Sequence, residues 1–285
     1  MSADDIPATD PPAADLCAAD LSAARPAVAA RLRAAGCVWA EDEADLLISA
    51  ARGEAELSAL VGRRAAGEPL EYVLGWAEFR GLRIAVDPSV FVPRRRTEFL
   101  AGQAVTLARP QAVVVDLCCG SGALAAALAA AVPGAVVHAT DIGPAAVRCA
   151  RRNLAAAGGQ VYQGDLFGPL PAGLRGRVDV LLANVPYVPT GEVGLLPPEA
   201  RDHEARVALD GGADGLEVLR RVVAEAPGWL APGGRLLSEV SERQVAAATA
   251  AVTAAGLTTS VARSAEHGAT VLVATRPAEQ DPGPR

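Results

Sequence analysis

The sequence contains no lysine, since all 26 of its basic residues other than histidine are arginines. Schiff-base chemistry and P-loop binding of nucleotide phosphates are thereby excluded, because both require a lysine amine. The formal net charge of −7 disfavours a broad nucleic-acid-binding surface, although it leaves room for a local basic patch.

Cysteine and histidine are also scarce. The five cysteines are odd in number and contain no Cys-x-x-Cys spacing, which favours reduced thiols. The three histidines, His138, His203 and His267, show no metal-ligand spacing, so we expect no metal site.

Long apolar runs are missing as well, and no stretch is long enough for a membrane-spanning helix. Residues 1–12 carry three aspartates and several prolines where a signal peptide has a basic segment and an apolar core. We therefore expect a cytoplasmic protein with no membrane partner.

Composition and periodicity divide the chain into five predicted segments. Residues 1–14 and 277–285 are rich in Pro, Asp and Gly, which predicts disordered tails. Residues 15–78 carry apolar stripes at helical spacing, which predicts a small helical domain that either recognises a macromolecular substrate or acts as a stabilising cap. Residues 79–97 predict a β-hairpin linker that brings this domain against the active-site face, and residues 98–276 predict the catalytic domain.

From Gln111 onward, strand and helix patterns alternate, which predicts a parallel, doubly wound sheet. The first five strands are expected over residues 112–117, 135–140, 160–163, 178–183 and 234–240. The last two, 258–263 and 269–274, are too close in sequence for a helical crossover and must pair antiparallel. A seven-stranded Rossmann-like sheet of the α/β class that ends in such a hairpin resembles the fold of class I S-adenosylmethionine-dependent methyltransferases.

A turn of small residues follows the first of these strands and reads Asp116-Leu117-Cys118-Cys119-Gly120-Ser121-Gly122. Small residues let the backbone approach a ligand closely, and the helix that follows offers free N–H groups. The turn resembles the glycine-rich motif of S-adenosylmethionine enzymes, with Cys118 in place of its first glycine. A nicotinamide cofactor is the alternative for this turn, and the terminal hairpin argues against it.

Two further acids follow the second and third predicted strands. Asp141 comes 25 residues after Asp116, where an acid in dinucleotide folds accepts hydrogen bonds from ribose hydroxyls. Asp165, in Gly164-Asp165-Leu166-Phe167, is placed to meet an adenine amine, with an apolar neighbour for the face of the ring.

The tetrapeptide Asn184-Val185-Pro186-Tyr187 ends the predicted strand 178–183. It places an amide side chain, backbone carbonyls and an aromatic ring at the carboxyl end of a strand, where open α/β sheets bind their ligands. We interpret the tetrapeptide as a clamp for a planar NH2 group; the alternative is a strand end with a plain turn.

These motifs together resemble the HemK/PrmC-type glutamine N5-methyltransferases, which act on peptide chain release factors in translation termination. The resemblance covers roughly residues 16–275. Besides the motifs above, it includes Gly67–Gly75, Phe79, Pro93-Arg94, Thr97-Glu98, Asn153, Glu204, Gly211-Gly212, Asp214-Gly215-Leu216, Glu239 and Gln244.

The resemblance implies that residues 98–276 transfer a methyl group from S-adenosylmethionine to a release factor glutamine, in the sequence Gly-Gly-Gln. It implies catalytic roles for Asn184, Val185, Pro186 and Tyr187, with the Asn184 side-chain oxygen and the Val185 carbonyl accepting the two NH2 hydrogens. It implies cofactor contacts from Asp116, Cys118, Gly120, Gly122, Asp141, Ile142, Asp165, Leu166 and Asn184. It implies substrate contacts from Phe91, Arg94, Thr97 and Glu204. We expect a monomer.

Besides Cys118, four positions depart from the family pattern. Val185 and Ala205 stand where the family has proline, and Arg95 and Arg96 stand where it has proline or an acid. Val185 keeps the required carbonyl, but it lacks the fixed φ of proline and gains an N–H. We therefore expect retained activity with a looser site or an altered substrate.

Two other functions remain compatible with the sequence. Adenine N6 and guanine N2 methyltransferases use the same tetrapeptide chemistry on a flipped base, and Arg63-Arg64 and Arg94–Arg96 are candidate RNA contacts. The second function is that of a non-catalytic binding module that has kept the fold. A solvated charge run is the alternative for the three consecutive arginines.

Overall fold

The structure of the protein, a computed structural model, describes residues 24–278. The chain forms two compact units, which divide between Leu74 and Gly75. The predicted tail over residues 1–14 lies outside the described residues, as does most of the tail over 277–285.

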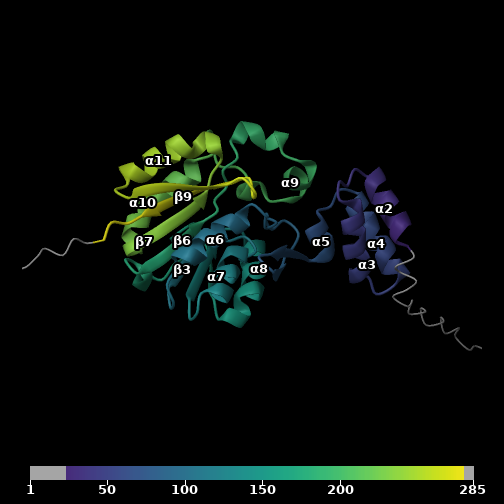
Figure 1. The fold of residues 1–285 in the computed structure, drawn as a ribbon, viewed down its shortest axis with the longest axis horizontal. Coiled ribbons are helices and arrows are strands. Elements are labelled where there is room, and N and C mark those ends of the chain that lie inside the picture. The colour runs from purple at the N-terminus through teal and green to yellow at the C-terminus, as the bar shows by residue number, and fades with distance from the viewer. Residues whose placement is uncertain (1–23, 279–285) are drawn as a thin grey trace, which may run out of the picture. The chain divides into compact units, whose positions relative to one another are not determined.

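The first unit is helical (Figure 1). Its described helices are α2 Arg25–Ala34, α3 Ala40–Ala50, α4 Glu54–Ala65 and α5 Leu70–Leu74. Apolar residues from these helices, among them Leu32, Leu47 and Val61, form one core. Inside this unit, the Arg64 guanidinium makes a buried ion pair at 2.6 Å with Glu43.

The second unit begins with a hairpin of β1 Trp76–Phe79 and β2 Leu82–Ala85, which pair antiparallel. A hairpin is therefore present, but it begins at Trp76, three residues before the predicted linker over 79–97, and its second strand ends at Ala85. Helix α6 Thr97–Leu107 follows and was not expected from the sequence. Its buried residues, Leu100, Ala101 and Ala104, pack into the same core as the hairpin residues Phe79 and Ile84.

The seven-stranded sheet has the order β5-β4-β3-β6-β7-β9-β8, with β8 and β9 antiparallel at its edge, which confirms the predicted fold class. The strands are β3 Val113–Leu117, β4 Val136–Asp141, β5 Gln160–Gln163, β6 Val178–Ala183, β7 Leu230–Glu239, β8 Thr258–Ser264 and β9 Ala269–Thr275. Strand order reverses between β3 and β6, where Leu117 pairs with Ala183. Open α/β sheets bind ligands outside the carboxyl ends of strands at such a switch point.

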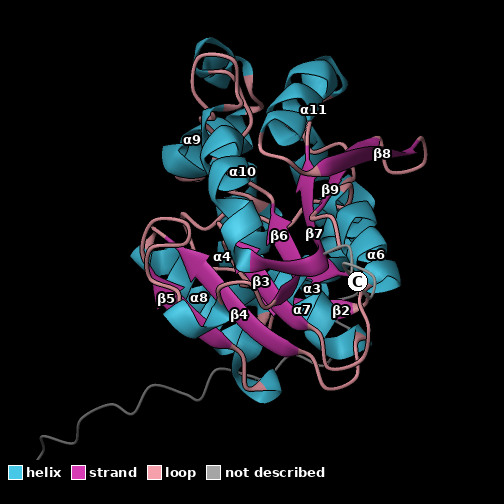
Figure 2. Ribbon diagram, turned by 90° about the vertical axis from the view of Figure 1, so that its left-hand side faces the viewer, coloured by secondary structure: helices cyan, strands magenta, loops and turns pink. Residues whose placement is uncertain are grey.

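Helices cover both faces of the sheet (Figure 2). Alternate residues of β3 point to opposite faces, so Val114 joins the core under α6, α7 and α8 while Val115 joins the core under α10 and α11. The helices that accompany α6 are α7 Ala123–Ala131, α8 Pro144–Leu154, α10 Glu217–Trp229 and α11 Val245–Ala254.

The crossover from β6 to α10 is long, and its sequence shows no clear helix or strand pattern before α10. It contains the short helix α9 Pro198–His203 and two 3-10 turns, η3 Thr190–Leu195 and η4 Arg206–Ala208. The remaining 3-10 turns are η1 Ala155–Ala157, η2 Ala172–Leu174 and η5 Glu242–Gln244.

Two searches of the described residues gave a negative result. Between residues 24 and 278, no helix is both long and apolar enough to cross a membrane. The same residues contain no group of three or more His, Cys, Asp or Glu side chains arranged to hold a metal ion.

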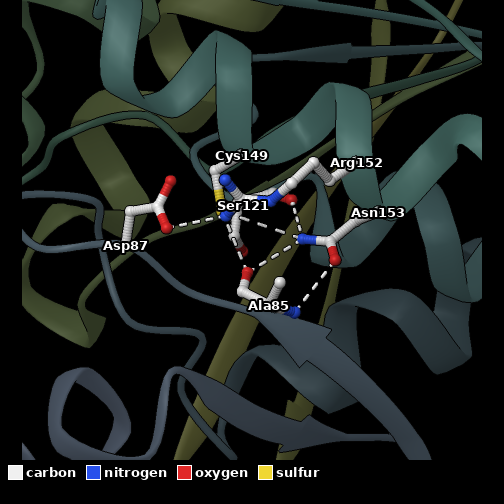
Figure 3. A network of polar contacts seen from close by, with 6 residues as sticks. All are labelled: Ala85, Asp87, Ser121, Cys149, Arg152 and Asn153. Atoms are coloured by element: carbon white, nitrogen blue, oxygen red, sulfur yellow. Dashed lines mark hydrogen bonds and ion pairs between the residues drawn. The ribbon is translucent and has the colours of Figure 1, made fainter.

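Asn153 of α8 ties the hairpin to the turn after β3 (Figure 3). Its Nδ2 donates to the Ala85 carbonyl at 2.9 Å and to the Ser121 carbonyl at 2.8 Å, and its Oδ1 accepts from the Ala85 N–H at 2.9 Å. The Cys149 thiol also lies 2.9 Å from the Ala85 carbonyl oxygen. One side chain therefore fixes the end of β2 against the turn of small residues.

We expect Asn153→Ala to lower the free energy of unfolding by about 1–3 kcal/mol, because the Ala85 N–H and the Ser121 carbonyl lose their partner and the Ala85 carbonyl keeps only Cys149. The measurement is urea unfolding followed by circular dichroism. Arg152→Ala is the matched control, since Arg152 lies next to Asn153 and makes a half-exposed ion pair with Asp87, which contributes about 1 kcal/mol or less. Equal losses in the two variants would contradict this account.

Candidate functional site

A cavity of about 890 Å³ lies at the carboxyl ends of the parallel strands. Its walls come from the segments that follow four neighbouring strands: 116–121 after β3, 141–146 after β4, 164–166 after β5 and 184–188 after β6. The long crossover and the segment before α6 complete the lining. The cavity therefore occupies the switch point of the sheet.

Most residues that the sequence analysis selected line this cavity. They are Phe91, Arg94, Thr97, Asp116, Cys118, Gly120, Asp141, Ile142, Asp165, Leu166, Asn184, Val185, Pro186 and Tyr187. Gly122 and Glu204 do not line the cavity, but each positions a segment that does.

Gly122 allows two helices to come close together. It precedes α7 with φ +78°, and a Cβ there would lie 3.1 Å from the Ala150 Cβ of α8. Glu204 holds a wall of the cavity, because its buried carboxylate accepts from the Val92 N–H at 3.0 Å and from Arg94 at 2.6 Å.

The turn after β3 contains a buried acid and a strained backbone. Asp116 is 1% exposed; its Oδ2 accepts from the Ala125 N–H at 3.2 Å, while Oδ1 has no partner among the described residues. Burial raises the pKa of Asp116 to about 8. Cys118 has φ +53°, the left-handed region that favours the glycine usual at this position. Strained residues of this kind cluster at ligand sites.

Asp141 shapes the same turn from the neighbouring strand. Its Oδ2 accepts from the Gly120 N–H at 2.9 Å and its Oδ1 from the Gly143 N–H at 2.8 Å. Burial raises the pKa of this carboxyl above its ordinary value, although the two N–H groups oppose the rise. Asp165 is half exposed and forms an ion pair with Arg221, so that both charges lie in the cavity wall.

Asn184 carries the most informative polar atom in the cavity. Its Oδ1 is buried and accepts no hydrogen bond from any described residue. Leaving a buried acceptor unpaired costs about 1–3 kcal/mol, which a ligand N–H placed at this oxygen would recover. Val185, the next residue, is 2% exposed and is packed in the core under α10.

The end of the tetrapeptide is held by residues that the sequence analysis recorded only as family matches. Gln244 donates from Nε2 to the Tyr187 carbonyl at 2.9 Å. A Cβ at Gly215 would overlap that carbonyl oxygen, so only glycine fits there. The Tyr187 hydroxyl donates to Glu239 at 2.8 Å. These supporting residues carry no motif signal of their own, because their role depends on contacts across the fold.

Two of the three consecutive arginines have defined partners. Arg94 pairs with Glu204 at 2.6 Å, and Arg96 pairs with the buried carboxylate of Glu239 at 2.8 Å. The interpretation of the run as solvated charge therefore does not hold for Arg94 and Arg96, which pair with buried carboxylates. Arg95 and Arg96 are both exposed, and only Arg95 lacks a partner among the described residues.

Comparisons with known proteins were made for the sequence and for the structure. The methyltransferase small domain family matches residues 84–195. The release factor glutamine methyltransferase of Mycolicibacterium smegmatis is 42% identical over 214 residues, which cover 74% of each chain. That of Bradyrhizobium diazoefficiens is 36% identical over 256 residues, which cover 82% of this chain and 86% of the relative.

The match to the release factor glutamine methyltransferase of Geobacter sulfurreducens is shorter, with 44% identity over 183 residues. It covers 64% of this chain and spans 63% of the length of that relative. Among solved structures, a methyltransferase from Pyrococcus furiosus has a TM-score of 0.53 at 18% identity, covering 70% of this chain and 90% of that chain. This structural likeness shows a shared fold.

The raised pKa of Asp116 predicts how stability depends on pH. In the folded protein this group binds its proton up to about pH 8, whereas its ordinary pKa is 3.8. The folded state therefore holds more protons between these values, so the contribution of Asp116 to stability falls as pH rises from about 4 to 8 and then levels off. Asp116→Asn removes this dependence.

We expect Asp116→Asn to match the wild type near pH 4 and to exceed its free energy of unfolding at pH 8 by on the order of a few kcal/mol. Urea unfolding of both proteins across this pH range measures the difference. Parallel stability curves would show that Asp116 ionises normally in the folded protein.

Proposed function

The chain belongs to the family of release factor glutamine methyltransferases, and we propose that it methylates the side-chain nitrogen N5 of a glutamine in a peptide chain release factor. S-adenosylmethionine is the methyl donor of this class of enzyme. The unpaired, buried Oδ1 of Asn184 carries the proposal, because it offers an acceptor for an amide N–H inside the cavity.

The residues of the cavity fit the donor. Asp116 offers an unpaired buried oxygen, and the backbone of 118–121 approaches the space closely. Asp141, Asp165 and Leu166 follow the next two strands and line the same space. We assign these residues to the donor, which when bound supplies an electrophilic methyl group on a sulfonium sulfur.

An amide nitrogen is a poor nucleophile, because its lone pair is delocalised into the carbonyl group. In the proposed mechanism, Asn184 Oδ1 and the Val185 carbonyl accept the two NH2 hydrogens, which favours a pyramidal nitrogen in the transition state. Tyr187 packs on the planar amide and aligns it. The side chain of Val185 is buried, which holds its carbonyl in place beside Asn184.

The proposed acceptor is the glutamine of a Gly-Gly-Gln sequence in the release factor. Release factors act on ribosomes, so the proposed place of action is the cytoplasm. We propose that the enzyme works as a monomer.

A nucleic-acid acceptor is less well supported. Four of the five arginines that were candidate RNA contacts have carboxylate partners, and only Arg95 lacks one among the described residues. Arg64 pairs with Glu43 in the core of the helical unit, and Arg63 pairs with Glu68. Arg94 and Arg96 pair with carboxylates behind the cavity wall. A surface that binds the phosphate backbone of a nucleic acid needs Arg or Lys side chains that are not already paired with carboxylates.

A tritiated-methyl transfer assay tests the acceptor directly. We expect label in a release factor that carries Gly-Gly-Gln, and none in the same factor with its glutamine replaced by alanine. Total RNA is the second comparison. Label in the alanine form or in RNA, with no dependence on the glutamine, would overturn the proposed substrate.

We expect Asn184→Ala to lower the transfer rate roughly 100- to 1000-fold, because one acceptor of the NH2 group is lost in the transition state. Donor affinity, measured by calorimetric titration with S-adenosylhomocysteine, should stay close to the wild-type value. Asp141→Ala is the contrasting variant and should weaken donor affinity first, because its carboxylate shapes the turn after β3. Unimpaired turnover in Asn184→Ala would refute the assignment.

A further inference from the structure

Glu239, at the end of β7, lies behind the cavity wall and is 3% exposed. Its Oε1 accepts from the Tyr187 hydroxyl at 2.8 Å and pairs with Arg96 Nε at 2.8 Å. Its Oε2 accepts from the Thr97 hydroxyl at 2.8 Å. Tyr187, Arg96 and Thr97 all line the cavity, whereas Glu239 does not.

The carboxylate of Glu239 is held in one orientation. A buried charge is tolerated only when it is paired and hydrogen-bonded, and here both oxygens have partners from the start of α6. The backbone of Glu239 is fixed as well, because it pairs with Val271 in the sheet. The hydroxyl of Tyr187 therefore meets an acceptor that has little freedom to move.

Tyr187 is consequently restrained at both ends. Glu239 accepts from its hydroxyl, and Gln244 donates to its backbone carbonyl at 2.9 Å. The Arg96 guanidinium carbon lies 5.6 Å from the centre of its ring. Burial and the charge of Glu239 hold the pKa of Tyr187 above its ordinary value, so the phenol keeps its proton and remains a donor.

We propose that Glu239 is a positioning residue for methyl transfer, which acts by fixing the ring of Tyr187 where the acceptor amide packs. This role rests on the proposed function, because it needs an amide on the ring. Glu239 touches neither donor nor acceptor in this arrangement, so its effect on the acceptor passes through the cavity residues that it holds, of which only Tyr187 belongs to the tetrapeptide. Removal of the carboxylate or of the Tyr187 hydroxyl should then release the ring of Tyr187 in the same way.

The test compares Glu239→Gln, Tyr187→Phe and the double variant in methyl transfer to the release factor. We expect each single variant to lower kcat by up to about 100-fold, since small displacements in an aligned site are costly. The double variant should be no slower than the slower single variant, because both changes break one interaction. The affinity for S-adenosylhomocysteine and the melting temperature should stay near their wild-type values.

Glu242→Gln is the matched control. Glu242 lies three residues further along, pairs with Arg263 and is 62% exposed, so the same chemical change there should leave kcat unchanged. If Glu239→Gln lowers the melting temperature, Tyr187→Phe decides alone, because it keeps the ring and the carboxylate. Normal kcat in Tyr187→Phe, or additive losses in the double variant, would overturn the proposal.

A readout without methyl transfer separates this proposal from the proposed function. The chain has three tyrosines, so 3-fluorotyrosine labelling yields three ¹⁹F resonances, and Tyr187→Phe identifies one of them. We expect Glu239→Gln to shift or broaden the Tyr187 resonance and Glu242→Gln to leave it unchanged. An unchanged resonance in Glu239→Gln refutes the positioning role, whereas a wild-type enzyme that fails to label the release factor refutes the function.

Discussion

Buried carboxylates at the ends of strands hold the cavity together. Asp116, Asp141 and Glu239 lie at or next to the carboxyl ends of β3, β4 and β7. They accept hydrogen bonds from the start of α7, from the turn after β3 and from the tetrapeptide after β6, respectively. Because a buried polar group needs hydrogen-bond partners, each of these acidic side chains fixes the segment that donates to it. The loops that form the cavity walls are thereby positioned by the sheet. Their conformation depends less on the residues within the loops themselves.

The valine in the tetrapeptide illustrates the consequence. Proline at this position would restrict φ, and Val185 lacks that restriction. The structure restrains the segment by other means: Val185 is packed in the core under α10, Gln244 holds the carbonyl of Tyr187, and Glu239 holds its hydroxyl. Rigidity that a proline supplies through one covalent ring is here distributed over contacts from β7 and η5. The looser site that the loss of proline predicts stays a prediction.

The helices and strands around the sheet were predictable because each has a strong local pattern. Strands β5 and β6 occupy the predicted residues, and the antiparallel end follows from the short connection between β8 and β9. Helix α6 was missed because Arg94–Arg96 precede it and no side chain caps its start. The short helices in the crossover after β6 were not predicted either, because tertiary contacts stabilise them.

The sequence by itself determined the fold class and the residues at the ends of β3, β4, β5 and β6, because a strand of given direction presents its last residues at one edge. Only the tertiary structure decided which of these residues face the cavity and which support it. Glu204 and Gly122 are behind the wall, and Glu239 reaches Tyr187 from 52 residues away in sequence. Contacts of this kind leave no periodic signal in the sequence, because they join residues that are far apart along the chain and meet only in the folded protein.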